Sequence, residues 1–200
     1  MQQKGKFIVL EGPDGSGTTL HSRLLSEYLE SIGKEVVLTR EPTDRPIGSM
    51  IRTMLKDRKE IEPSTLQLLF CADRSDHVEN IVLPALEQSK IVISDRYTLS
   101  TIIYGTTLGL NRDWLKSVNS IFPVPDLTLI ALPPLSVCLE RINRRENQDP
   151  LETNTIQESV HSGYSNINNQ NTFTVDTTGG KEEVSQMIIS HVKKRFPELD

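Results

Sequence analysis

The sequence predicts an α/β protein in which helices cover both faces of one parallel sheet. Short apolar segments with the composition of buried strands alternate along the chain with longer segments of helical periodicity. In addition, three segments, "EGPDGSG", "TREP" and "DRY", each lie at the carboxyl end of one of those strands. Ligands bind to such sheets at the carboxyl ends of the strands. The three segments should therefore meet at one site.

The first half of the chain should form three strands and three helices. The strands are short apolar runs, the first of which leads into the glycine segment. After it, leucines, Tyr28 and Ile32 recur at helical spacing, and Gly33 ends the pattern. Pro63 with Ser64 is a typical helix start. The predicted strands are 6–12, 34–41 and 90–97, and the predicted helices are 18–33, 46–59 and 63–88.

The second half continues the same alternation. "PDLTLIAL" has the composition of a buried strand, and proline opens the helical segment after it. "NQDPLETNTI" is polar and should form a loop. Because no repeat and no linker interrupt the chain, we expect one domain spanning residues 1–200. The predicted strands are 125–132 and 172–176, and the predicted helices are 99–122, 133–146, 156–167 and 180–196.

Composition narrows the class of protein. Of 200 residues, 36% are hydrophobic and the net charge is −5, which favours a soluble globular protein and argues against a surface that coats nucleic acid. Cys71 and Cys138 lie in apolar helical patterns, which indicates buried reduced thiols instead of a disulfide or a metal site. No apolar run has the length of a membrane span, and "MQQKGKFIVLEG" is not typical of a signal peptide. We therefore expect a cytoplasmic location.

The stretch "GPDGSGTT" has the spacing of a phosphate-binding loop, in which Gly, four residues and Gly precede Lys and then Ser or Thr. Glycines let the backbone turn its N–H groups toward phosphate oxygens, and the following helix adds its positive end. A glycine-rich turn without a ligand is the alternative, but the strand before the loop and the helix after it favour binding. The residues expected to bind ATP are Gly12, Pro13, Asp14, Gly15, Ser16, Gly17, Thr18 and Thr19.

Position 18 departs from this pattern, because it holds threonine where the loop normally has lysine. The lysine ammonium reaches the β- and γ-phosphates and offsets charge that moves in the transition state. Thr18 can donate one neutral hydrogen bond and carries no charge. Turnover should suffer unless another cation fills the gap. His21 and Arg23 lie downstream, but nothing in the sequence brings them to the phosphates.

Several segments, in this order, resemble the thymidylate kinase family of P-loop nucleoside monophosphate kinases. They are "FIVLEGPDGSGTT", "VVLTREP", "LLFCADRSDH", "ISDRYTLSTIIYG" and "TVDTTGGKEEV", and they run nearly end to end. The resemblance implies, through the family spacing, that position 18 is substituted and not deleted. The resemblance implies a three-layer fold of the P-loop NTPase type with a short lid at about 141–155. It also implies phosphorylation of dTMP by ATP with Mg²⁺, in dTTP synthesis, and a homodimer.

The resemblance also implies roles around the monophosphate. Asp14 would bond the 3′-hydroxyl of the sugar, Phe70 would stack on the thymine and Arg74 would bond its carbonyl. Arg96 would clamp the phosphate, for which a bidentate guanidinium is well suited. From the residues alone, Asp14 could be a turn residue and Phe70 part of the core. The implied substrate-binding residues are Asp14, Arg40, Phe70, Arg74, Arg96, Ser100, Tyr104 and Tyr164.

Further implied roles concern the metal and the transferred phosphoryl group. Thr19 and Asp95 would hold Mg²⁺, and a charged residue that ends a buried strand, as Asp95 does, should face a site. The alternative for Asp95 and Arg96 is a structural salt bridge. The lid would add an arginine near the phosphoryl group, although solvated charges are the alternative there. The implied catalytic residues are Asp95, Arg96, Arg144 and Arg145.

Two other functions stay open at this point. Thr18, Leu20, His21 and Pro150 depart from the family pattern, which is compatible with a nucleotide-binding protein of weak or absent kinase activity. A kinase for another pyrimidine monophosphate is the other alternative, since one methyl group in a pocket is worth only about 1–3 kcal/mol.

Overall fold

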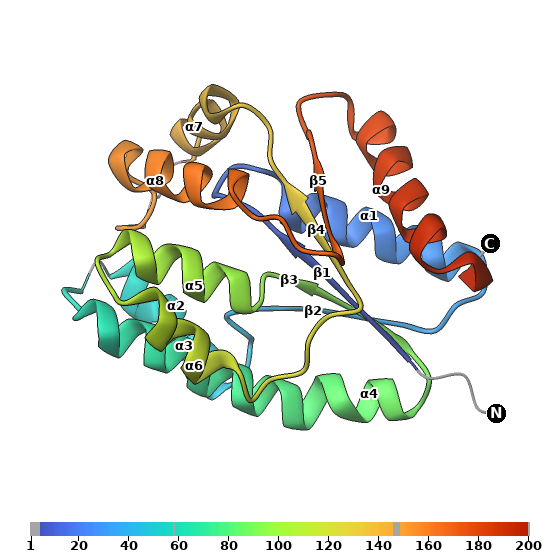
Figure 1. The fold of residues 1–200 in the computed structure, drawn as a ribbon, viewed down its shortest axis with the longest axis horizontal. Helices are drawn as coiled ribbons and strands as arrows, with labels where there is room; N and C mark the ends of the chain where they lie inside the picture. The colour runs from blue at the N-terminus through green and yellow to red at the C-terminus, as the bar shows by residue number, and fades with distance from the viewer. Residues whose placement is uncertain (1–4, 58, 146–148, 200) are drawn as a thin grey trace.

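A computed structural model of the chain describes residues 5–57, 59–145 and 149–199. At its centre lies a sheet of five strands in the order β2-β3-β1-β4-β5, and every pair is parallel (Figure 1). The predicted α/β fold and its five strands are therefore confirmed. Residues 146–148 of the predicted lid, residue 58 of one predicted helix and residues 1–4 lie outside the described residues. The strands are β1 Lys6–Glu11, β2 Val36–Arg40, β3 Ile91–Asp95, β4 Leu127–Ala131 and β5 Thr172–Val175.

Helices cover both faces of the sheet. In Figure 1, α1 and α9 lie side by side on one face, and α3 and α4 lie on the other, joined by a π-helical turn at Val78–Val82. Helices α5 and α8 pack on each other beside β4. The helices are α1 Thr18–Ser31, α2 Pro46–Lys56, α3 Pro63–His77, α4 Leu83–Glu87, α5 Thr98–Thr107, α6 Arg112–Asn119, α7 Leu135–Asn143, α8 Asn154–Ser165 and α9 Lys181–Arg195.

The central strands are buried on both faces because alternate side chains enter two separate cores. In β1, Ile8 and Leu10 join the core that α1 and α9 cover, whereas Phe7 and Val9 join the core under α3 and α4. This explains why the strands are continuous apolar runs in the sequence and do not alternate with polar residues. Glu11 continues the Phe7 and Val9 face and is the charged residue at the end of the run.

The segment 99–122, predicted to be mostly helical, contains two helices. A turn separates α5 from α6. Gly109 adopts a left-handed conformation with φ +88°, which ends α5, and the Asn111 side chain accepts a hydrogen bond of 2.9 Å from the Trp114 N–H, which caps α6. Both signals are present in the sequence, but the apolar periodicity continues across them.

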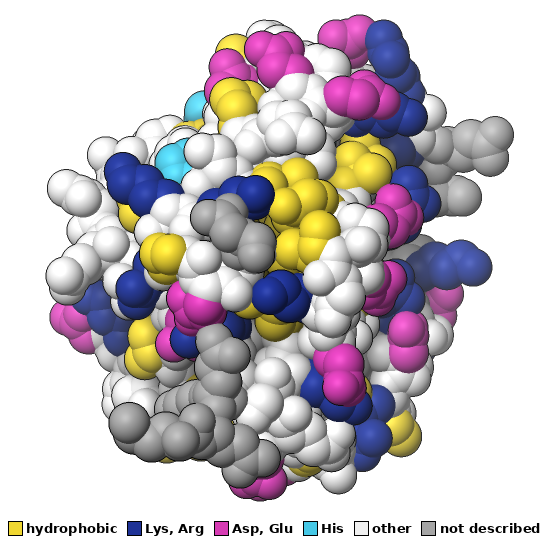
Figure 2. All heavy atoms as spheres, turned by 90° about the vertical axis from the view of Figure 1, so that its right-hand side faces the viewer, with side chains coloured by type: hydrophobic (Ala, Val, Ile, Leu, Met, Phe, Trp, Pro, Cys, Tyr) yellow, Lys and Arg dark blue, Asp and Glu magenta, His cyan; other side chains and the backbone are white. Residues whose placement is uncertain are grey.

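The surface shows no segregation of charge on the face in Figure 2. Acidic and basic side chains lie next to one another there, around an apolar area near the centre of the view. Among the described residues, no helix combines the length and the apolar character needed to cross a membrane.

Gly48 should be essential to the packing of α2. An added Cβ would lie 2.2 Å from the Thr43 carbonyl oxygen, which belongs to the backbone and cannot rotate away. Helix propensity alone predicts that Gly48→Ala stabilises the protein by about 0.5–1 kcal/mol. We expect instead a loss of about 1–3 kcal/mol, because the backbone must shift. Thermal unfolding tests this.

Gly180→Ala is the matched control for Gly48→Ala. Gly180 has φ −59°, and no atom lies within 4 Å of a Cβ added there. The melting temperature of the Gly180→Ala variant should therefore change little. Equal melting temperatures for both variants would contradict the close approach at Gly48.

Candidate active site

The glycine segment forms a tight loop between β1 and α1. Gly15 and Gly17 have φ values of +76° and +94°, in the left-handed region that favours glycine. Gly17 directly precedes α1, so the N–H groups of the first turn of that helix border the loop. A Cβ on Gly15 would lie 2.4 Å from the Cys138 carbonyl oxygen. The backbone of α7 thus packs directly on the loop and leaves no room for a side chain.

Arg141 and Thr177 brace the loop from outside. Thr177 Oγ1 donates to the Ser16 carbonyl at 2.6 Å, and Arg141 donates to the carbonyl oxygens of Gly15 at 3.2 Å and Thr177 at 2.8 Å. Arg141 thus binds the C=O groups of these peptides, whereas a phosphate would bind N–H groups. Arg141 therefore holds the shape of the loop.

The two predicted lid arginines lie elsewhere. Arg144 is exposed and pairs with Glu140 one turn earlier, and Arg145 pairs with the buried carboxylate of Glu152. Among the described residues, no hydrogen bond or ion pair joins Arg144 or Arg145 to the glycine loop. The structure does not bring these two residues to the site.

Arg141 is a charged side chain close to position 18, since its Nη1 would lie 3.9 Å from a Cβ on Gly17, but its hydrogen bonds go to carbonyl oxygens. Thr18 is buried at the start of α1. The buried ring of His21 lies beside Gly17, but burial, together with Arg141, lowers the pKa of His21, so the imidazole is neutral at pH 7. Arg23 is exposed and pairs with Glu27. His21 and Arg23 therefore do not replace the missing ammonium in this conformation.

Thr19 and Asp95 form a site that fits a magnesium ion. Thr19 Oγ1 donates to Asp95 Oδ2 at 2.5 Å, and Asp95 Oδ1 is buried with no hydrogen-bond partner among the described residues. Hydroxyl and carboxylate oxygens suit Mg²⁺, which keeps several waters and needs few protein ligands. The described residues contain no cluster of three His, Cys, Asp or Glu side chains that could hold a metal. Any such ion would thus depend on these two residues, water and phosphate oxygens.

Asp14 and Arg96 join the glycine loop to the end of β3. Arg96 Nη2 donates to Asp14 Oδ1 at 2.5 Å, and Arg96 Nη1 donates to the Gly12 carbonyl at 2.8 Å. The Tyr104 hydroxyl donates to Asp14 Oδ2 at 2.6 Å. Arg96 also has φ +71°, a conformation that costs energy for a residue with a side chain and that often marks a functional site.

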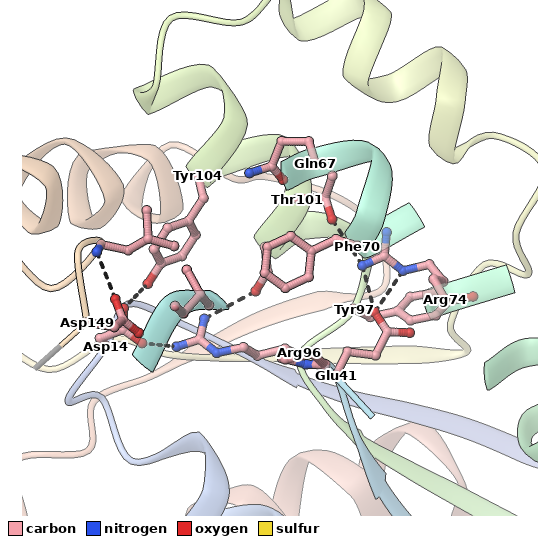
Figure 3. A pocket seen from close by; sticks show the side chains of 14 residues that line it. Asp14, Glu41, Gln67, Phe70, Arg74, Arg96, Tyr97, Thr101, Tyr104 and Asp149 are labelled. Carbon is pink, nitrogen blue, oxygen red and sulfur yellow. Dashed lines mark hydrogen bonds and ion pairs between the residues drawn. The ribbon is translucent and has the colours of Figure 1, made fainter. Parts of the chain in front are cut away.

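These residues form one wall of a pocket (Figure 3). The pocket is small in this structure, with a volume of about 110 Å³. Phe70 and Arg74 project into it from α3, so the structure brings together four residues that the sequence singled out separately. The lining consists of Asp14, Glu41, Pro42, Leu55, Gln67, Phe70, Arg74, Arg96, Tyr97, Ser100, Thr101, Tyr104, Asp149 and Leu151.

Glu41 holds Arg74 in place on the pocket wall. Arg74 Nε and Nη2 both donate to Glu41 Oε2, at 2.9 and 2.7 Å, and both side chains are buried. Arg74 also donates to Asn119 and Thr101, so four of its five N–H groups have protein partners among the described residues. His77 binds the other Glu41 oxygen at 2.9 Å. Arg74 is thus oriented and keeps one N–H for a ligand.

Three other residues were predicted to bind the substrate, and only one of them lines the pocket. Ser100 lines the pocket and accepts from Arg96 Nη1 at 3.2 Å. Tyr164 is completely buried and reaches the site through Ser100, whose hydroxyl is 3.0 Å from the Tyr164 hydroxyl. Arg40 pairs with Asp44 at 2.7 Å and lines a separate hollow that also contains Thr19 and Asp95. Tyr164 and Arg40 therefore do not line the pocket of Phe70 and Arg74.

The structure adds two buried residues that sequence reasoning missed. Glu11 accepts four hydrogen bonds, two from Ser100 and one each from the Tyr97 N–H and the Tyr164 hydroxyl. Gln157 accepts from the Asp14 N–H at 3.1 Å and donates to Asp14 Oδ2 at 2.9 Å, which orients this carboxylate. Glu11 could have been found, because it is a charged residue at the end of a buried strand, as Asp95 is. Gln157 gives no signal in the sequence.

Two carboxyl groups in and next to the pocket, those of Asp149 and Glu11, have raised pKa values. Burial raises the pKa of Glu11, and hydrogen bonds from Ser100 and Tyr164 lower it in part. Burial and the neighbouring Asp14 raise the pKa of Asp149 to about 6. Carboxyl groups with raised pKa values are common in functional pockets.

The fold and the site together define a class of protein. A parallel sheet with a glycine loop before α1, a Thr–Asp pair beside it and an arginine-lined pocket is the arrangement of a P-loop phosphotransferase. The family model described as "Thymidylate kinase" matches residues 10–188. The chain belongs to the thymidylate kinase family.

Individual relatives agree with this assignment. The "Probable thymidylate kinase" of Pyrococcus horikoshii is 46% identical over 147 residues, which is 71% of this chain and 72% of that protein. The "Probable thymidylate kinase" of Pyrococcus abyssi is 37% identical over 198 residues, which is 95% of this chain and 97% of that protein. The "Thymidylate kinase" of Pelobacter propionicus is 38% identical and covers 94% of each.

Glu11→Gln should destabilise the protein. The substitution replaces one acceptor oxygen by an amide that faces hydrogen-bond donors, in a fully buried site. We expect a loss of about 1–3 kcal/mol in the free energy of unfolding, measured by denaturant titration. Glu140→Gln is the control, since Glu140 makes an exposed ion pair on α7 and its loss should have little effect. Similar free energies of unfolding for both variants would show that the Glu11 bonds are not needed.

Proposed function

We propose that the protein transfers the γ-phosphoryl group of ATP to dTMP, giving dTDP and ADP, in the synthesis of dTTP. The observation that carries this proposal is the single pocket that Asp14, Phe70, Arg74 and Arg96 share next to the glycine loop. A retained acceptor pocket of this kind fits a family of thymidylate kinases. No covalent intermediate is required, because phosphoryl transfer depends on positioning and electrostatics.

At the acceptor end, each residue has a task that its chemistry supports. The Arg96 guanidinium would bind the phosphate of dTMP, and Asp14 would accept a hydrogen bond from the 3′-hydroxyl. Phe70 would stack on the base, and the remaining N–H of Arg74 would donate to a base carbonyl. Because Gln157 and Glu41 already orient Asp14 and Arg74, little ordering of these side chains would remain when dTMP binds.

At the donor end, the loop from Gly12 to Gly17 would surround the ATP phosphates with backbone N–H groups. Thr19 and Asp95 would hold Mg²⁺, which, when bound, neutralises phosphate charge during transfer. The loop and the first turn of α1 would orient the γ-phosphate toward Arg96.

The lid at about 141–155 would complete the site. Arg144 and Arg145 lie away from the loop, so their proposed contribution requires a rearrangement of the lid that releases Glu140 and Glu152. We also propose a cytoplasmic homodimer with magnesium as the resident metal. The free, buried thiols of Cys71 and Cys138 are compatible with a reducing compartment.

An assay coupled to ADP release tests the proposed reaction. With dTMP, ATP and Mg²⁺, the protein should release ADP in proportion to dTDP formed. Asp95→Asn should lower kcat at least about 100-fold, since it removes a charge that acts on the metal and the phosphoryl group. Asp113→Asn, at an exposed carboxylate on α6, should retain full activity. The absence of ADP release from the unmodified protein would refute the reaction.

Thr18 is the observation that favours the second candidate, a nucleotide-binding protein with little turnover. We expect Thr18→Lys to raise kcat about 10- to 100-fold, because a charge-assisted hydrogen bond to the phosphates is worth about 1.5–3 kcal/mol. The KM for dTMP should stay unchanged, since Thr18 does not line the monophosphate pocket. Thr18→Val is the control and should not raise kcat.

The same assay separates the two functions. If neither the unmodified protein nor Thr18→Lys turns over while both bind ATP in calorimetry, the binding protein is favoured. An unchanged kcat in an active Thr18→Lys variant would show that the loop does not need an ammonium at this position.

A further inference from the structure

Gln67 has no role so far, although it is the least satisfied polar side chain of the pocket. It lies on α3 with 1% of its surface exposed. Neither its amide oxygen nor its amide nitrogen has a hydrogen-bond partner among the described residues. A buried amide without partners is costly, so such a group usually meets a ligand or water. Gln67 is also one of the residues that line the pocket.

The position of Gln67 on α3 directs the amide to the same space as Phe70 and Arg74. Gln67 precedes Phe70 by three residues and Arg74 by seven, so the three share one face of the helix. A Cβ on Gly105 would lie 3.2 Å from Gln67 Cγ, which shows that α5 packs against the aliphatic part of the side chain. Figure 3 shows the amide end in the pocket, near Thr101 and Tyr104.

The three residues on this face complement a pyrimidine that carries carbonyl groups beside an N3–H. Phe70 offers an apolar surface and Arg74 offers only donors, so neither can accept a hydrogen bond from N3–H. Gln67 offers both an acceptor and a donor. Its amide can accept from N3–H and donate to a neighbouring carbonyl, as glutamine and asparagine amides do when they bind base edges.

We propose that Gln67 is a specificity-determining residue that hydrogen-bonds the N3–H edge of a thymine or uracil base. The proposal rests on the proposed function, because it assigns the base of the monophosphate to this pocket. Gln67 and Arg74 together would favour dTMP and dUMP over dCMP. The Gln67 amide could turn to donate to N3 of cytosine, but Arg74 cannot accept from the cytosine amino group. The thymine methyl group would not be recognised by Gln67.

Calorimetry without ATP tests this proposal with two ligands, dTMP and its N3-methyl derivative. Gln67→Leu should weaken dTMP binding about 10- to 100-fold, because it removes both hydrogen bonds and keeps the volume. N3-methylation should weaken binding to the unmodified protein by a similar factor. The same methylation should change binding to Gln67→Leu less than about threefold, because the variant has lost the acceptor.

Several controls separate a binding role from a structural one. Gln67→Glu retains an acceptor and should recover part of the dTMP affinity. Gln186→Leu, at an exposed position on α9, should bind dTMP as the unmodified protein does. In the kinase assay, Gln67→Leu should raise the KM for dTMP and leave kcat and the KM for ATP within about threefold.

Unchanged dTMP affinity in Gln67→Leu, or an equal effect of N3-methylation on both proteins, would overturn the assignment. If Gln67→Leu has a reduced melting temperature, Gln67→Met, which is unbranched like glutamine and also lacks an amide, decides by the same comparison. If the unmodified protein binds dTMP but releases no ADP, phosphoryl transfer fails and the calorimetric comparison still judges Gln67. If it binds no dTMP, both proposals fail.

Discussion

The ion pair between Asp14 and Arg96 is the contact on which the site depends. It joins the glycine loop to the end of β3, two segments that are 82 residues apart in the sequence. Arg96 makes this bond from a left-handed backbone conformation, which the surrounding bonds to Gly12 and Ser100 maintain. Tyr104 and Gln157 hold the Asp14 carboxylate from α5 and α8. Each neighbouring element thus contributes to the geometry of one pair.

Two buried carboxylates support the rest of the pocket in the same way. Glu11 lies below the start of α5 and fixes Ser100, whereas Glu41 lies at the end of β2 and fixes Arg74. Buried charges are tolerated only where partners satisfy them, and both carboxylates have several. Loss of one partner would leave an unpaired charge in a nearly dry environment, so the polar layer under the pocket should tolerate few substitutions.

The sequence predicted the sheet and most helices, because strand composition and helical periodicity are local signals. Asp14 and Arg96 stood out by their positions after a strand, whereas Phe70 and Arg74 were indicated only by the resemblance to the family, since helical periodicity alone favours a core position for Phe70. The break between α5 and α6 at Gly109 lies within a segment that was predicted as mostly helical, because apolar periodicity does not fix where one helix ends and the next begins. Gln157 and Gln67 could not be found, since a lone glutamine on a helix has no pattern and its partners come from other elements. The ion pairs of Arg144 and Arg145 likewise follow from side-chain positions that spacing does not determine.

The loop with threonine at position 18 attracts nucleotides over a shorter range than a loop with lysine would. Asp14 is the one charged residue in "GPDGSGTT", and Arg96 neutralises it. The loop residues then act on an approaching nucleotide through peptide and helix dipoles, whose field falls off faster with distance than that of a full charge. The full positive charge on the loop is that of Arg141, which binds the Gly15 carbonyl from outside. Long-range attraction of phosphates to this loop therefore depends on a residue outside the motif.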